Sequence, residues 1–358
     1  MYKYLLVILE KGAVSFCHYS NPYYHSQGQP SFMPLDLLEK IVRYARDKEL
    51  FVNFLYGKHR LPTKYEALID TVDHVKMIPL SLQESYPDGV LVLDAGERDA
   101  FGSIGKNASR NIILRVEQFD LRQLASDVDL LRGTFKRLNL HLVGIERFTE
   151  KDIELYETQV KAMGEKLQQA YKMGGEIEIN ILTDRMLLQQ MNNCDAGVKH
   201  LTIAPNGQCY ICPGFYHDDE AATVGVWNED QEILIDNQRL LSLQCAPICS
   251  QCDAFHCKRC VYLNQLMTLE INVPSKEQCV LAHTEREASR QMLKRLRNIK
   301  PFDMLPAIRS LSYRDPFEVV AQPIGNSDPL LADRAEDLDV DDYLTQIYEM
   351  QKKILQKL

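Results

Sequence analysis

Long apolar runs and an excess of positive charge are both missing from this sequence of 358 residues. No apolar run approaches the roughly eighteen residues of a membrane-spanning helix. The formal net charge is −9, whereas a general nucleic-acid-binding protein carries a basic stripe. The opening MYKYLLVILEKG has no small-residue cleavage site after its apolar part, so we expect a buried strand rather than a signal peptide. These absences predict a cytoplasmic protein that binds neither membranes nor nucleic acids.

Cysteine is nearly absent from the first half of the chain and concentrated in the second. Cys17 is the single cysteine before Cys194, and nine of the ten lie between Cys194 and Cys279. Cytoplasmic thiols stay reduced, so cysteine at this density indicates metal or redox chemistry rather than disulfides.

Short apolar segments alternate with helical stretches through the first 185 residues. The segments 4–10, 50–57, 75–80, 90–96, 111–117, 140–146 and 176–182 have the character of buried strands. Strands that alternate with crossover helices predict a mainly parallel sheet covered on both faces. About six such units favour an open, partial barrel, but the pattern alone does not separate that barrel from a doubly wound sheet.

The composition divides the chain into three predicted parts. Residues 1–188 carry the strand–helix alternation, and residues 189–285 carry the cysteines and the turn sequences PNG and CPG. Residues 286–358 form a predicted helical extension that contains the acidic linker LADRAEDLDVDD. A small domain without a large core often depends on bound metal for its stability.

The stretch CSQCDAFHCKRC places four cysteines within the twelve residues from Cys249 to Cys260. Closing two such closely spaced CxxC pairs on one zinc ion requires a very tight loop, because zinc sites usually keep the pairs apart. Iron–sulfur proteins tolerate denser runs. The spacing therefore favours iron–sulfur clusters, with structural zinc as the alternative.

The order of the cysteines resembles the SPASM domain of peptide-modifying radical S-adenosylmethionine enzymes. Cys194 is followed by twelve residues, Gly207, four residues and Cys212, and then by the cysteine run and Cys279. The upstream half matches the family pattern, whereas the last two gaps of the run, of four and two residues, are each one residue shorter. HLTIAPNGQCYICPG is similar to the strand-turn-strand that opens such domains. The resemblance covers roughly residues 190–285 and implies an iron–sulfur domain.

This resemblance implies two [4Fe–4S] clusters. The first set of ligands would be Cys194, Cys212 and Cys260. The second set of ligands would be Cys249, Cys252, Cys257 and Cys279. Either Cys209 or Cys245 would supply the eighth thiolate, and the residues do not decide between them.

The same family implies a partial (β/α)6 TIM-like barrel of the radical S-adenosylmethionine type in front of the cysteine-rich domain. Such enzymes hold a further cluster with CxxxCxxC after the first strand, but here Ala13, Cys17 and Ser20 occupy the three positions. Where the family has a GGE stretch, this chain has Lys58 and His59 after its glycine, and a cation repels the methionine ammonium group. The expectation is a degenerate fold that does not cleave S-adenosylmethionine and has no recognisable catalytic residue.

The segments FCHYSNPYY, MPLDLLEKIV and FVNFLYGK are similar to the "CXXX repeat peptide maturase" group. That resemblance implies maturation of a ribosomally made, cysteine-repeat precursor peptide beside an active radical S-adenosylmethionine partner enzyme. The alternatives are a non-catalytic module that binds and delivers the peptide, an unrecognised activity of the iron–sulfur domain, and a zinc-stabilised scaffold.

Overall fold

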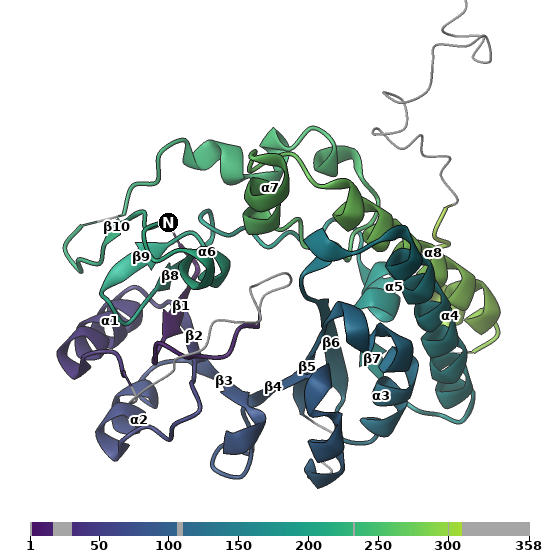
Figure 1. The fold of residues 1–358 in the computed structure, drawn as a ribbon, viewed down its shortest axis with the longest axis horizontal. Helices are drawn as coiled ribbons and strands as arrows, with labels where there is room; N and C mark the ends of the chain where they lie inside the picture. The colour runs from purple at the N-terminus through teal and green to yellow at the C-terminus, as the bar shows by residue number, and fades with distance from the viewer. Residues whose placement is uncertain (1, 17–30, 106–109, 232, 300, 310–358) are drawn as a thin grey trace, which may run out of the picture. The chain divides into compact units, whose positions relative to one another are not determined.

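A ten-stranded sheet forms the centre of the fold in the part of the chain that the structure describes (Figure 1). The computed structural model of the protein describes residues 2–16, 31–105, 110–231, 233–299 and 301–309. The strands are adjacent in the order β10-β9-β8-β1-β2-β3-β4-β5-β6-β7. All neighbours from β8 to β7 are parallel, and β9 and β10 pair antiparallel. The strands are β1 Tyr4–Ile8, β2 Phe51–Leu55, β3 His74–Pro79, β4 Val90–Asp94, β5 Asn111–Val116, β6 Arg137–Leu142, β7 Glu178–Ile179, β8 His200–Ile203, β9 Gln208–Tyr210 and β10 Gly225–Val226.

The first strand is apolar throughout because both of its faces are covered. Leu5 and Val7 pack in the main core together with side chains of the outer helices. Leu6 and Ile8 alternate with them and pack in a separate apolar cluster on the inner face. A strand of a parallel sheet that is buried on both faces has this continuous apolar sequence.

Helices cover the outer face of the curved sheet (Figure 1). The longest of them, α4, begins with a capping box in which the Thr149 amide donates to Asp152 Oδ2 at 2.8 Å. The described parts of the β3–β4 and β4–β5 connections form 3₁₀ turns instead of α-helices. The helices are α1 Leu35–Asp47, α2 Thr63–Ile69, α3 Leu124–Leu130, α4 Glu150–Lys172, α5 Arg185–Leu187, α6 Pro213–Asp218, α7 Val261–Thr268 and α8 Lys276–Leu296.

The predicted strand at 176–182 is much shorter than expected. It pairs only at Glu178–Ile179, and a π-type turn follows at Asn180–Asp184. The Asn180 side chain takes over the pairing with β6, accepting from the Leu140 amide at 2.8 Å and donating to the Leu140 carbonyl at 3.1 Å. Asparagine competes with ladder hydrogen bonds in this way, so the apolar pattern extends beyond the true strand.

The cysteine-rich segment runs from the β10 end of the sheet to the β7 end (Figure 1). At one end β8 pairs in parallel with β1, and at the other α8 packs against α4, where Tyr156 Oη donates to Glu285 Oε1 at 2.6 Å. The α/β class with a mainly parallel sheet is confirmed. Because β8 belongs to the same sheet and residues up to Arg309 form one compact unit, the domain boundaries after 188 and 285 stay predictions.

Two further sequence predictions concern membrane-spanning helices and the C-terminal part of the chain. Within the described residues, no helix is both long and apolar enough to cross a membrane. The acidic linker and the rest of the predicted helical extension after residue 309 lie outside the described residues.

Candidate metal centre

A cavity of about 350 Å³ lies between the inner face of the sheet and the cysteine-rich segment. Tyr4 and Leu6 of β1 line it from the sheet. All three members of the first set, Cys194, Cys212 and Cys260, line it as well. The structure therefore gathers three cysteines from well-separated chain positions around one cavity.

Local structure fixes each cysteine of the first set. The Cys194 amide donates to the Lys258 carbonyl at 3.0 Å, which ties the loop before β8 to the cysteine run. Cys212 and Cys260 are the N-cap residues of α6 and α7. The Leu263 amide donates to Cys260 Sγ at 3.5 Å. Amide hydrogen bonds of this kind stabilise a thiolate or a sulfur bound to metal.

The three thiols are close enough to influence one another electrostatically. Burial raises the pKa of Cys212 to about 12, and the neighbouring Cys194 acts in the same direction. Burial also raises the pKa of Cys260 well above its usual value, with Cys212 adding to the effect. Bound metal is the ordinary means of keeping such a buried group of cysteines in the thiolate form.

Arg259 lies in the chain between Cys257 and Cys260, and it is only 1% exposed. Its guanidinium donates to Asn193 Oδ1 at 3.0 Å and to the Leu241 carbonyl, while Nη1 has no partner among the described residues. Burial lowers the pKa of Arg259, and nearby cysteine sulfur opposes that change. A buried cation needs negative charge around it. Asp195 supplies part of that charge, and metal-bound thiolates would add to it, whereas neutral thiols would not.

The second set has three members in the cysteine run and one in helix α8. Burial raises the pKa of Cys257 to about 12, and other members of the set contribute to the rise. Cys279 lies in the first turn of α8, and its helix neighbours contact the run. Gln278 Nε2 donates to Cys257 Sγ at 3.8 Å, and His283 Nε2 lies 3.6 Å from Cys252 Sγ.

Buried polar side chains anchor the second set to its surroundings. Asp253 lies 3.3 Å from Arg185 of α5 and 2.9 Å from Arg286 of α8. His256, also within the run, is buried, and its Nε2 lies 3.0 Å from Glu285 Oε2. That nitrogen is therefore engaged by a carboxylate and is not offered to a metal.

The donor set also bears on the kind of metal group. Tetrahedral zinc draws its ligands to about 2.0–2.3 Å from one point. Among the residues that the structure describes, no three cysteine, histidine, aspartate or glutamate side chains meet in this way. A four-iron cluster takes each protein ligand at a separate iron, so its ligands surround a wider volume. The first set borders one cavity, and the choice between iron–sulfur clusters and zinc stays a prediction.

The two candidates for the eighth thiolate have different surroundings. Cys209 is fully buried on β9 and belongs to the main apolar core. Cys245 is half-buried at the end of a 3₁₀ turn, and its carbonyl accepts from Asn272 Nδ2 at 2.9 Å. Neither is among the described residues that line the cavity.

The segment where the resemblance predicts a lost cluster site lies at the carboxyl ends of β1 and β2. Ala13 is buried in an apolar cluster on the inner face, while Cys17 and Ser20 lie outside the described residues. Glu10, which is 1% exposed, forms an ion pair with His59. A side chain at Gly57 would collide with the Glu10 carboxylate. A buried carboxylate thus pairs with an exposed histidine at the carboxyl ends of β1 and β2.

Sequence reasoning missed His200 and Glu10. His200 is a buried polar residue that opens an apolar strand six positions after Cys194, and that contrast was the available signal. Glu10 follows the apolar run of β1 and forms a bridge with Phe32, so its burial depends on a distant segment.

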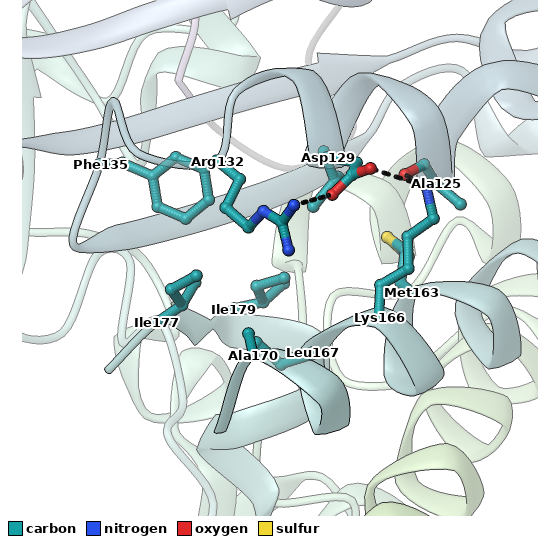
Figure 2. Close-up of a pocket in the computed structure, with 11 residues that line it drawn as sticks. Ala125, Asp129, Arg132, Phe135, Met163, Lys166, Leu167, Ala170, Ile177 and Ile179 are labelled. Atoms are coloured by element: carbon teal, nitrogen blue, oxygen red, sulfur yellow. Dashed lines mark hydrogen bonds and ion pairs between the residues drawn. The ribbon is translucent and has the colours of Figure 1, made fainter. Parts of the chain in front are cut away.

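A second cavity, between α3, α4 and β7, is too small for a substrate (Figure 2). It encloses about 20 Å³, little more than one water molecule needs. Figure 2 shows Arg132 and Lys166 directed at Asp129, with separations of 3.2 and 3.1 Å. This arrangement is an ordinary set of ion pairs over an apolar helix contact.

The fold is similar to that of anSMEcpe in several solved structures. Native anSMEcpe with bound AdoMet aligns with a TM-score of 0.54 and 15% identity, over 83% of this chain and 100% of that chain. The complex of native anSMEcpe with AdoMet and Cp18Cys peptide gives 0.53 and 13%, over 83% and 99%. The complex with AdoMet and Kp18Cys peptide gives 0.52 and 12%, over 82% and 99%.

At these identities the likeness establishes the fold alone. It confirms the predicted class, an α/β fold with a mainly parallel sheet. No protein-family profile matches the chain, and no curated protein sequence does. The SPASM-like character of the cysteine-rich segment stays a prediction.

Proposed function

We propose that this chain is an iron–sulfur protein that takes part in the maturation of a ribosomally made, cysteine-repeat peptide. The observation that carries the proposal is the convergence of three cysteines on one cavity beside the sheet. Support also comes from the fold, which is similar to anSMEcpe structures that contain AdoMet and a peptide.

The proposed cofactors are two [4Fe–4S] clusters, one at the first set and one at the second. Such clusters, when bound, supply electron transfer and Lewis-acidic iron. The chain's own contribution is electrostatic: Lys258 and Arg259 place two cations between the sets, and backbone amides donate to the sulfurs of Cys257 and Cys260. These groups offset the negative charge of thiolate-ligated iron.

The proposed role does not include cleavage of S-adenosylmethionine. Ala13 has no ligand atom, and its side chain is enclosed by apolar neighbours. The Glu10 carboxylate already has His59 as its partner, so it is not offered to a methionine ammonium group. We therefore assign any radical step to a separate partner enzyme.

The cavity is the proposed contact for the peptide. Tyr4, Val261 and Tyr262 give it apolar walls, while Asn53 and Asn192 offer amide groups for a peptide backbone. A cysteine thiol enters such a space more readily than a serine hydroxyl, because an unpaired buried hydroxyl costs about 1–3 kcal/mol. We expect a preference for cysteine over serine of about tenfold or more.

The test uses full-length, anaerobically purified protein and a synthetic peptide of repeated Cys-Ala-Gly-Ser units. Fluorescence anisotropy measures binding of the labelled peptide, and the peptide with serine in place of each cysteine is the matched control. Dithionite and S-adenosylmethionine are then added, and liquid chromatography–mass spectrometry follows 5′-deoxyadenosine and the peptide mass.

We expect saturable binding of the cysteine peptide, weaker binding of the serine peptide, no 5′-deoxyadenosine and an unchanged peptide mass. Equal binding of both peptides, or no binding, would remove the peptide role. Production of 5′-deoxyadenosine would overturn the claim of a lost radical site. A changed peptide mass without it would establish an enzyme that acts on its own.

A further inference from the structure

The first set offers three thiolates, whereas a four-iron cluster presents four irons to protein ligands. We infer that the imidazole of His200 is the fourth protein ligand, which makes the site at the cavity a three-cysteine, one-histidine centre. This inference rests on the cofactor of the proposed function. It replaces the expectation that Cys209 or Cys245 completes the set.

His200 is placed for this role by its position on the sheet. It opens β8, is 2% exposed, and lines the same cavity as the three cysteines. Its Nε2 lies 3.6 Å from Cys194 Sγ, so the ring is beside a member of the first set. Its Nδ1 is buried and has no hydrogen-bond partner among the described residues.

The ring is also held in a fixed orientation. His200 is paired with Tyr4 in the register of β8 and β1. The two rings are stacked, with centroids 4.7 Å apart and planes inclined by 25°. A ligand whose rotamer is fixed by packing loses little entropy when it binds metal.

The strand register places Cys209 on the wrong face of the sheet for ligation. Side chains along a strand alternate between faces, so His200 and Ile203 of β8 point to opposite faces. Ile203 is paired with Cys209 on β9, and directly opposed residues share a face. Cys209 accordingly packs with Ile203 in the main core, on the face away from the cavity.

Imidazole and thiolate differ in charge, and this gives the inference a measurable consequence. A neutral imidazole in place of one thiolate leaves the cluster one unit less negative. Histidine ligation raises the reduction potential of iron–sulfur centres for this reason. His200→Cys should therefore keep both clusters and shift the potential of one of them downward.

The direct test is pulsed electron paramagnetic resonance of the reduced, full-length protein grown with ¹⁵N-labelled histidine. We expect a strong ¹⁵N hyperfine coupling, characteristic of an imidazole bound directly to iron, in the unsubstituted protein. The coupling should vanish in His200→Cys. It should persist in His141→Asn, because His141 is not the proposed ligand. His141 is a matched control because it lines the same cavity from β6.

Two results would overturn the inference. One is the absence of a strong ¹⁵N coupling in the unsubstituted protein, which needs no variant to fold and would reduce His200 to a hydrogen-bond partner of Cys194. The other is a loss of about four irons per chain in Cys245→Ser, which would return the fourth position to a thiolate.

The failure of this inference is distinguishable from failure of the proposed function. A cluster with coupled nitrogen in a protein that binds no peptide would refute the peptide role alone. Peptide binding by a protein without that coupling would refute the histidine ligand alone.

Discussion

The two sets of cysteines are close in the sequence but differ in their surroundings. The first set is assembled from three separate segments and borders a cavity that reaches the inner face of the sheet. The second set takes three members from one run, and α8 covers it with Gln278 and His283. In the proposed function the first set faces the peptide, whereas the second set joins the run to α8.

The largest expected effect comes from removing one ligand of each set in turn. Cys212→Ala and Cys257→Ala should each lower the iron content from about eight to about four per chain, because each removes a ligand of one cluster. Cys212→Ala should also weaken binding of the cysteine peptide by about tenfold or more. Cys257→Ala should leave that affinity within about threefold and lower the stability instead.

Iron analysis, anisotropy and anaerobic thermal unfolding check these outcomes together. Cys209→Ser is the control, because its side chain faces the main core. It should keep about eight irons per chain. Equal losses of peptide affinity in the two alanine variants would contradict the proposal that the first set, and not the second, faces the peptide.

A smaller effect tests the anchoring of the second set. Tyr156→Phe removes the donor to Glu285, whose other oxygen pairs with His256. Losing a hydrogen bond to a charged, buried acceptor should lower the free energy of unfolding by about 1.5–3 kcal/mol. Tyr171→Phe, which removes a donor to the carbonyl of Ile177, should cost about 1 kcal/mol.

Anaerobic denaturation with urea measures both variants. The iron content should stay unchanged in each, because neither tyrosine is a proposed ligand. A larger loss in Tyr171→Phe than in Tyr156→Phe would show that the buried network does not anchor the run.

The sequence was most informative where structure follows from local pattern. Apolar segments separated by helical stretches predicted the parallel sheet, because buried strands are apolar on both faces. The resemblance to the SPASM pattern grouped Cys194, Cys212 and Cys260 as one set of ligands, and the structure places these three around one cavity. Cys212 and Cys260 are the N-cap residues of α6 and α7, so local structure restricts where these two thiols lie.

The remaining features depend on contacts between distant segments. Asn180 ends β7 by bonding to Leu140, forty residues earlier, which no local pattern indicates. His200 reaches the cavity because β8 pairs with β1, and Cys209 turns away because of the same register. A motif that counts only cysteines cannot include a histidine supplied by strand pairing.

The most direct test of the account is the iron and sulfide content of anaerobically purified, full-length protein, measured together with Mössbauer spectra. We expect about eight irons and eight sulfides per chain, all in four-iron clusters. Zinc in place of iron would contradict the assignment of both sets, and about twelve irons would reveal a third cluster beside the first strand.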